Sequence, residues 1–257
     1  MIATADSVTE LGEVAGRVLV AGSHAGRVAV HYASAAGARA VILNDAGVGL
    51  DEAGVAGLAL LDAVGMAAAA VDHASARIGD GADMLARGVV SRANRGAGAL
   101  GIAPGMRCAD AATRLLASPP PASRLPRYPE GRYVLSDRVI GVDSIGMLQA
   151  DDAGRVLVIG SHCALHGGRP ETALPIGAAL AFFNDAGGAV SRLAVLDGRG
   201  IPAAAVGCMS ARIGDARSMW ESGIVSFANE KAVRLGIVPG KSLAAAIHAV
   251  CAPREQR

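Results

Sequence analysis

The sequence predicts an α/β protein made by tandem duplication of a βαβαβα unit, with parallel sheets flanked by helices and a pseudo-two-fold axis between the copies. Two observations lead to this prediction. Short apolar runs alternate with longer segments of helical periodicity, which is the pattern of buried parallel strands joined by crossover helices. Five segments also recur in the same order, about 135 to 140 residues apart, as expected of a duplicated chain.

The repeated segments are too numerous and too well ordered to arise by chance. The first is RVLVAGSH at 17–24, which returns as RVLVIGSH at 155–162, and an Asp-Ser dipeptide precedes each copy. The other four pairs are NDAG (44–47 and 184–187), SARIGD (75–80 and 210–215), GVVSRAN and GIVSFAN (88–94 and 223–229), and LGIAPG and LGIVPG (100–105 and 235–240). We interpret the set as an internal duplication.

The first copy shows the alternation of elements most clearly. Its predicted strands are the apolar runs at 17–23, 39–45 and 66–73. Its predicted helices are 25–38, closed by Gly37, then 49–65, with apolar residues every three positions and a stop at Gly65, and finally 83–101. The third helix would place Ser91 and Asn94 one turn apart, with Ser226 and Asn229 arranged likewise in the second copy.

The domain organisation follows from the repeat. We expect a first α/β repeat at 1–115 and a second at 136–257. The stretch between them, 116–135, is rich in proline and lacks periodicity. These features are typical of a linker.

Composition excludes several classes of protein. The 257 residues include 24 Lys+Arg against 23 Asp+Glu and 3% aromatic residues, with no basic block, so nucleic-acid binding is not expected. No run of about 18 uncharged apolar residues appears, which argues against a membrane span. The first residues lack the basic and apolar regions of a secretory signal, and the four cysteines lack the spacing of a zinc site. We therefore expect a cytoplasmic protein with reduced thiols.

The repeated polar residues gather where the predicted strands end. In an open α/β sheet, ligands bind beyond the carboxyl ends of the strands, beside helix N-termini. In both copies strand one ends in Ser-His, strand two ends in Asn-Asp, and strand three runs into Ser-Ala-Arg-Ile-Gly-Asp. Just before this last segment, His73 of the first copy is replaced by Cys208 in the second. We predict that a small anionic substrate binds at this edge.

Residue chemistry suggests a role for each candidate. Ser, His and Cys side chains supply nucleophiles and bases, and Arg holds a carboxylate through two parallel hydrogen bonds. The candidate catalytic residues are Ser23, His24, His73, Ser161, His162 and Cys208. The candidate substrate-binding residues are Asn44, Asp45, Ser75, Arg77, Asp80, Asn184, Asp185, Ser210, Arg212 and Asp215.

Each candidate also has a structural interpretation. The serines can cap helices, the histidines can bond the backbone, the Asn-Asp pairs can form turns, and each Arg can pair with the Asp three residues later. Free cysteines are most often small buried hydrophobes. We predict no metal and no cofactor. His24, Asp45, His73 and Asp80 could converge on a divalent ion, but no spacing demands it, and a dinucleotide fingerprint lacks its third glycine.

The favoured function is a small-molecule enzyme that hydrolyses an amide or related C–N bond of a carboxylate-bearing compound. One alternative is an isomerase or racemase with acid and base from the two halves, His73 and Cys208 being the opposed pair. The duplicated layout resembles that of the two-domain amino-acid racemases, which place one catalytic thiol in each half, although the thiols here do not fall at equivalent positions. Another alternative is a non-catalytic ligand-binding module. The substrate, the number of active repeats and the oligomeric state stay open, a homo-oligomer being one option.

Overall fold

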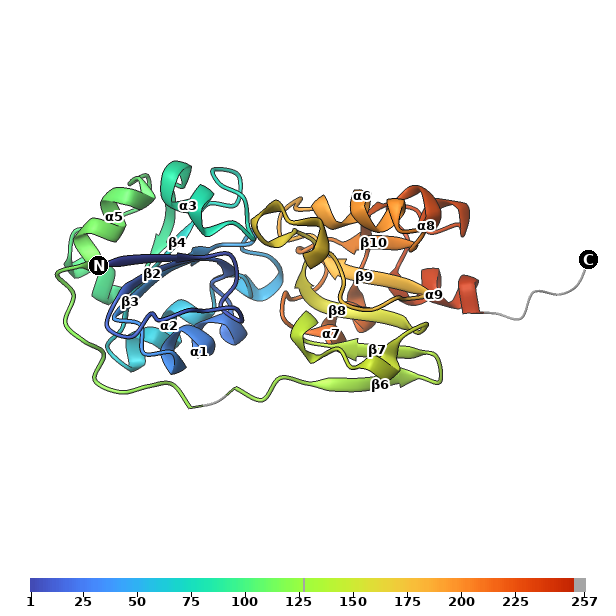
Figure 1. The fold of residues 1–257 in the computed structure, drawn as a ribbon, viewed down its shortest axis with the longest axis horizontal. Coiled ribbons are helices and arrows are strands. Elements are labelled where there is room, and N and C mark those ends of the chain that lie inside the picture. The colour runs from blue at the N-terminus through green and yellow to red at the C-terminus, as the bar shows by residue number, and fades with distance from the viewer. Residues whose placement is uncertain (127, 252–257) are drawn as a thin grey trace, which may run out of the picture. The chain divides into compact units, whose positions relative to one another are not determined.

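The computed structural model of the chain describes residues 1–126 and 128–251 (Figure 1). Two compact units divide it. The first comprises Met1–Pro129 with Leu165–Arg169, and the second comprises Glu130–Ala164 with Pro170–Arg257. Among the described residues, no helix combines the length and the apolar character needed to cross a membrane.

The first unit contains a five-stranded sheet in the order β1-β2-β3-β4-β5. Four of its strands are parallel and the last is antiparallel to its neighbour. The strands are β1 (Ile2–Ala5), β2 (Val18–His24), β3 (Ala40–Asn44), β4 (Ala67–Val71) and β5 (Val90–Ala93). Strand β1 was not predicted, because four residues of mixed burial show too little periodicity to identify a strand.

The second unit contains a six-stranded sheet in the order β11-β10-β9-β8-β7-β6. Its four central strands are parallel, and both outermost strands are antiparallel to their neighbours. The strands are β6 (Arg132–Ser136), β7 (Val139–Val142), β8 (Val156–His162), β9 (Leu180–Asn184), β10 (Ala203–Val206) and β11 (Val225–Ala228). Strand β6 therefore begins inside the stretch predicted as a linker.

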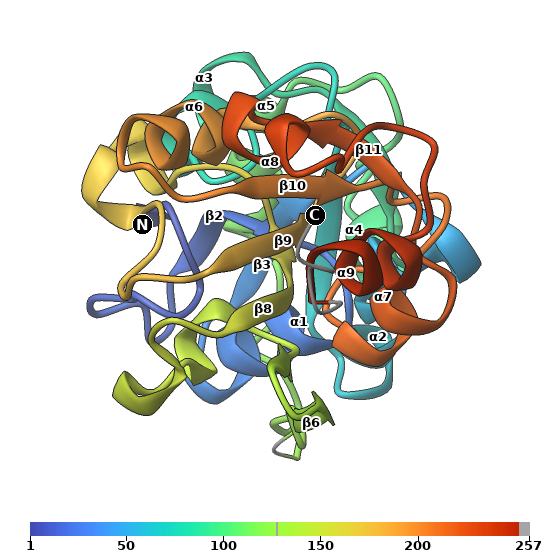
Figure 2. The ribbon, with the colours of Figure 1, turned by 90° about the vertical axis from the view of Figure 1, so that its right-hand side faces the viewer.

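Helices cover both sheets. In the first unit they are α1 (Arg27–Ala35), α2 (Gly57–Ala63), α3 (Gly81–Arg87), α4 (Arg95–Ala99) and α5 (Cys108–Leu115). In the second they are α6 (Ser191–Gly198), α7 (Ala216–Ser222), α8 (Glu230–Arg234) and α9 (Leu243–Cys251), with α7 and α9 next to each other (Figure 2). These elements confirm the predicted α/β class, with two parallel-dominated sheets flanked by helices.

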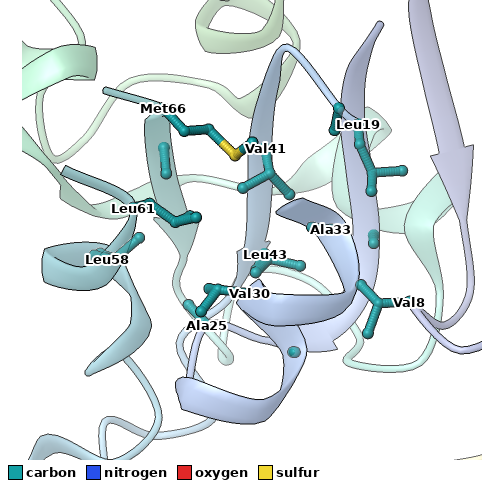
Figure 3. Packing of buried hydrophobic residues seen from close by; sticks show 14 of the residues in the cluster. Val8, Leu19, Ala25, Val30, Ala33, Val41, Leu43, Leu58, Leu61 and Met66 are labelled. Carbon is teal, nitrogen blue, oxygen red and sulfur yellow. The ribbon is translucent and has the colours of Figure 1, made fainter. Parts of the chain in front are cut away.

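Both faces of the first sheet are buried, which explains the unbroken apolar strands. Alternate residues of a strand point to opposite faces. Leu19 of β2 packs with residues of α1 and α2 on one face (Figure 3). Its neighbours Val18 and Val20 pack with Met84 of α3 and Leu115 of α5 on the other. Small side chains on β4, which reads AAAAV, complete this tightly packed three-layer arrangement.

The predicted third helix, 83–101, is wrong. The chain leaves α3 at Gly88 and pairs antiparallel with β4 through β5 before α4 begins. A Cβ atom at position 88 would lie 2.4 Å from the carbonyl oxygen of Met84 and 2.8 Å from a methyl group of Val71. Glycine is therefore required where the chain turns close against β4. Ser91 consequently lies on β5, and Asn94 caps α4.

The second unit departs from the predicted helix in the same way. Its helix α7 ends before Gly223, Ser226 lies on β11, and Asn229 caps α8 by accepting from the amide of Ala232. Neither half is therefore a plain βαβαβα unit, because an antiparallel strand interrupts the last predicted helix in both.

The two halves also differ between their Ser-His strand and the next strand. Where the first unit has α1, the described residues between β8 and β9 form only two 3-10 turns, η4 (His166–Gly168) and η5 (Pro170–Thr172). Gly167, Gly168 and Pro170 disfavour an α-helix here. The prediction of one element pattern for both copies is wrong at this point.

A buried arginine occupies this irregular region of the second unit. The amide of Arg192 donates to the carbonyl of Cys163, just as the amide of Gly57 donates to the carbonyl of Ala25 in the first unit. A side chain at Gly57 would meet Val30 of α1 at 2.5 Å, so that position tolerates only glycine. Without a helix in the way, the position in the second unit accommodates arginine.

The Arg192 side chain, which is fully buried, holds the irregular loop together. Its guanidinium donates to the carbonyls of His162, Thr172 and Ala173, and lies 5.5 Å from the ring centroid of Phe183. Backbone carbonyls that a helix would have satisfied internally are thus satisfied by one side chain.

We expect Arg192→Ala to lower the free energy of unfolding by about 3 kcal/mol or more, because several buried carbonyls lose their donor. Arg192→Met, which restores much of the volume but none of the hydrogen bonds, should recover only part of the loss. Urea unfolding measures both. Arg234→Ala, at a side chain that is 67% exposed, is the control and should change stability by less than about 1 kcal/mol. An Arg192→Met variant as stable as the parent would contradict the hydrogen-bonding role.

Candidate functional site

The predicted polar residues lie at the carboxyl edge of each sheet. Backbone pairing places His24 beside Asn44, and Asn44 beside Val71, at the ends of three adjacent parallel strands. In the second sheet His162 likewise lies beside Asn184. Each unit therefore brings its repeated strand-end residues to one edge of its own sheet.

The two serines anchor the segment that precedes their strand. Ser23 accepts a hydrogen bond from the amide of Val8 at 3.0 Å, and Ser161 accepts one from the amide of Ile145 at 2.9 Å. Neither caps a helix, since the α1 cap position is Gly26, which lacks a side chain. The repeated Asp-Ser dipeptides lie directly before these amides, which explains why this entry sequence recurs.

The adjacent histidines accept hydrogen bonds from the backbone. His24 Nδ1 accepts from the amide of Gly26 at 3.1 Å, and His162 Nδ1 accepts from the amide of Ala164 at 3.3 Å. Both rings are buried. Burial lowers the pKa of His24 to about 4, so its imidazole is neutral near pH 7 and a weak base.

The asparagines tie two loops together. Asn44 Oδ1 accepts from the amide of Ala46, while its Nδ2 donates to the carbonyl of Ala76 in the SARIGD segment. Asn184 makes the same pair of bonds in the second unit, to Ala186 and Ala211. Both side chains are fully buried, so this is the turn-forming role that the sequence analysis offered as an alternative.

The serines of the SARIGD segments are also held by the backbone. Ser75 Oγ donates to the carbonyl of Asp72 and accepts from the amide of Val89. Ser210 Oγ repeats both bonds in the second unit, with Gly207 and Ile224.

The arginines and aspartates that follow pair with each other. Asp80 caps α3 and Asp215 caps α7, each through Oδ1. Arg77 Nη2 lies 3.0 Å from Asp80 Oδ2, and Arg212 Nε lies 3.1 Å from Asp215 Oδ2. These are the structural pairs that the spacing allowed. Since 69% of the Arg77 side chain and 42% of the Arg212 side chain stay exposed, the ligand-binding role remains a prediction.

Asp83 is a buried carboxylate in this region that the sequence analysis did not select. It accepts from the Arg77 amide and from both Arg77 and Arg87 guanidinium groups. Burial raises the pKa of Asp83, but the hydrogen bonds and charges of the two arginines outweigh it and leave the pKa below its usual value. Its counterpart in the second unit is Ser218, which accepts from the Arg212 amide.

Asp45 and His73 form the most distinctive arrangement at the first edge. Asp45 Oδ1 accepts from the His73 amide at 3.0 Å and lies 2.9 Å from His73 Nδ1. The Asp45 side chain is 4% exposed, whereas the His73 side chain is 33% exposed. A buried carboxylate thus orients an accessible imidazole, and among the described residues none hydrogen-bonds to its Nε2.

Asp72 completes this cluster, and the sequence analysis did not assign it to the site. Its Oδ1 lies 3.4 Å from His73 Nδ1. One ligand atom from each of Asp45, Asp72 and His73 lies within 4.8 Å of the others, a spacing that suits a divalent cation. The signal for Asp72 was its place between the third strand and His73, where the second copy has Gly207.

The matching position in the second unit carries a thiol. Asp185 Oδ1 accepts from the amides of Gly187 and Cys208, just as Asp45 accepts from those of Gly47 and His73. Burial, and then the Asp185 carboxylate, raise the pKa of Cys208 to about 11. Cys208 is therefore a protonated thiol at neutral pH and not a thiolate nucleophile.

The backbone after Asp45 is strained in the first unit. Ala46, Val48, Asp51 and Glu52 have φ between 50° and 61°, the left-handed region that L residues avoid. Each such residue costs on the order of 1 kcal/mol or more, and strain of this kind concentrates at functional sites. In the second unit, Ala186 is the described non-glycine residue of the matching loop with such a φ.

His24 makes the stability of the first unit depend on pH. Its folded pKa of about 4 lies below the 6.5 of an unperturbed histidine, so the unfolded chain binds the proton first as the pH falls. Stability should be complete above pH 6.5 and decline below it, by about 2 kcal/mol between pH 7.5 and pH 5. We expect His24→Gln to remove this part of the slope in urea unfolding. Parallel slopes for parent and variant would contradict the assignment.

No family model, no curated protein and no solved structure matches this chain. The function must therefore be argued from the contacts at the two sheet edges. Of these, the Asp45–His73 pair combines an oriented base with access from solvent.

Proposed function

We propose that the chain is a small-molecule hydrolase that cleaves an amide or related C–N bond of a carboxylate-bearing compound, with Asp45 and His73 at its active site. The observation that carries this proposal is the 2.9 Å contact between a buried carboxylate and the Nδ1 atom of a partly exposed imidazole. An imidazole oriented in this way can act as a general base.

On this proposal each atom of the pair has a role. Asp45 is the positioning residue: it accepts a hydrogen bond from Nδ1–H, which leaves the lone pair on Nε2. His73 Nε2 takes a proton from water as the water oxygen bonds to the substrate carbonyl carbon. His73 then returns that proton to the nitrogen as the C–N bond breaks, which yields a carboxylic acid and an amine.

A duplicated ancestry supports a single active unit. We propose that the units arose by tandem duplication and that a pseudo-two-fold relation between them is its consequence. The matched hydrogen bonds of the serines, histidines and asparagines, and the matched caps, fit this origin. The copies differ at the catalytic position, where the second unit has Cys208 in place of His73. On this proposal the first unit retained the hydrolytic base.

One observation favours an isomerase as the second candidate. Cys208 occupies the position of His73 in its own sheet and keeps its proton at neutral pH. A histidine base and a thiol acid are the two groups that proton exchange at a carbon centre requires. The isomerase is the second candidate because the buried Cys208 thiol is a weak acid.

A panel of small linear and cyclic amides bearing a carboxylate, incubated in ¹⁸O-labelled water, tests the reaction class. Hydrolysis should place ¹⁸O in the product carboxylate, and His73→Gln should lower the rate about 10²- to 10⁴-fold without loss of folding. Asp45→Asn should act in the same direction. Cys208→Ser is the matched control in the second unit and should leave turnover unchanged. Deuterium uptake without net consumption would instead support the isomerase, and binding without turnover would contradict both.

The arginines provide a separate test of substrate binding. If they hold the substrate carboxylate, Arg77→Ala or Arg212→Ala should weaken binding about tenfold to several hundredfold, since charge-assisted hydrogen bonds contribute roughly 1.5–3 kcal/mol each. If they serve only their aspartate partners, the melting temperature should fall while affinity stays constant. Measuring melting temperature and affinity on the same variants separates the two roles. Unchanged affinity in both variants would contradict the substrate-binding role.

A further inference from the structure

Two carboxylates at the edge of the first sheet lie close together without a lysine or arginine partner. One ligand atom from each of Asp45, Asp72 and His73 lies within 4.8 Å of the other two. Among the described residues, neither carboxylate forms an ion pair with a lysine or an arginine, and His73 is the side chain that both contact. Two negative charges at this distance repel each other, and a cation between them removes the repulsion.

The buried member of the group, Asp45, has one oxygen without a hydrogen bond. Its side chain is 4% exposed. The amides of Gly47 and His73 and the Nδ1 atom of His73 all contact Oδ1. No hydrogen bond from the part of the chain that the structure describes reaches Oδ2. Buried carboxylates are normally paired with a cation or coordinate a metal, and Asp45 lacks the first kind of partner.

The distances within the group fit the coordination shell of a metal ion. Nδ1 of His73 lies 2.9 Å from Asp45 Oδ1 and 3.4 Å from Asp72 Oδ1. Nitrogen and carboxylate oxygen ligands bind Zn²⁺ at about 2.0–2.2 Å, so that adjacent ligands in a tetrahedral or octahedral shell lie roughly 2.8–3.6 Å apart. Asp72 and His73 are partly exposed, so an ion can enter from solvent.

The second unit provides an internal comparison. Asp185 accepts the same backbone hydrogen bonds as Asp45, but Gly207 and Cys208 replace the other two members of the group. The matching edge therefore offers a carboxylate and a protonated thiol in place of two carboxylates and an imidazole. The features that suit a cation are specific to the first unit.

We infer that Asp45, Asp72 and His73 bind a divalent transition-metal ion through one oxygen of each carboxylate and Nδ1 of the imidazole. One imidazole and two carboxylates suit Mn²⁺, Co²⁺ or Zn²⁺ better than Mg²⁺ or Ca²⁺, which prefer oxygen ligands alone. Because Nδ1 binds the ion through its lone pair, the ring proton moves to Nε2 when the ion binds.

This metal site shares residues with the proposed hydrolase but does not rest on it. In the proposed reaction the lone pair of His73 Nε2 is the base. A bound ion places the ring proton on Nε2, so the ion inhibits that reaction. Metal binding itself is the readout, and a failed hydrolase assay therefore leaves the test of the metal site intact.

Calorimetric titration of the full chain, freed of metal with EDTA, tests the site. We expect one Mn²⁺, Co²⁺ or Zn²⁺ ion per chain, with Mg²⁺ and Ca²⁺ bound at least about tenfold more weakly. Asp45→Asn, Asp72→Asn and His73→Gln should each weaken binding at least about 10- to 100-fold, the loss that even changes outside the ligand shell produce. The Asn variants keep an oxygen for the backbone amides, so the fold should persist.

The second unit supplies the matched control. Asp185→Asn removes the equivalent carboxylate and should leave metal affinity unchanged. His248→Gln, at an exposed histidine of α9, should also have no effect. Nitrogen-15 NMR of the His73 ring provides a second readout, since the proton should lie on Nδ1 in the metal-free chain and on Nε2 after Zn²⁺ is added.

Three results would overturn the inference. The first is the absence of saturable binding of Mn²⁺, Co²⁺ and Zn²⁺. The second is binding that persists at full affinity in Asp45→Asn, Asp72→Asn and His73→Gln. The third is binding that Asp185→Asn or His248→Gln weakens as much as these variants do, because the ion would then be held elsewhere.

Discussion

Burial of both sheet faces is the constraint on which the rest of the structure depends. The strands that carry the repeated motifs are buried along almost their whole length, so the polar groups of the loops at their ends meet little water. Buried amides and carbonyls must find partners within the protein. The serines, histidines and asparagines at the strand ends are those partners. Their recurrence in both halves follows from this packing requirement, whatever chemistry the protein performs.

This constraint changes how the internal repeat should be interpreted. Residues that both halves retain, such as Asn44 and Asn184, mostly satisfy the backbone. The proposed active site, in contrast, includes positions at which the halves differ. His73 and Asp72 differ from Cys208 and Gly207, and they adjoin the strained loop after Asp45.

The same reasoning explains what could be predicted from sequence. The strands at the centre of each sheet were predictable because two-sided burial leaves an unbroken apolar run. Strand β5 was not, because Val90 is buried while Arg92 is exposed, and a half-buried strand of four residues reads as part of a helix. The edge strand β1 was too short to be identified from its sequence. The absence of a counterpart of α1 in the second half could have been predicted from Gly167, Gly168 and Pro170. The similarity of the flanking motifs instead favoured one pattern for both halves.

The candidate site was predictable in location more than in membership. Strand order placed Asp45 and His73 at one edge, but no sequence pattern showed that the carboxylate is buried while the ring is accessible. That contrast depends on which loop covers which atom, and it separates an oriented base from a structural pair. Arg77 illustrates the opposite case, since the spacing to Asp80 offered a structural pair as the alternative to substrate binding, and the side chains form that pair.

The two halves show that matched strand ends tolerate unlike surroundings. In the second half one arginine takes over the carbonyls of an irregular loop, at a position where a side chain in the first half would collide with α1. In the second half β6 pairs with β7, whereas among the described residues no strand pairs with the outer edge of β1, the matching strand of the first half. Both differences lie at the periphery, while the hydrogen bonds at the strand ends stay the same. On the proposal of a common ancestor and a hydrolytic first unit, one buried edge presents a base, His73, in the first half and Cys208 in the second.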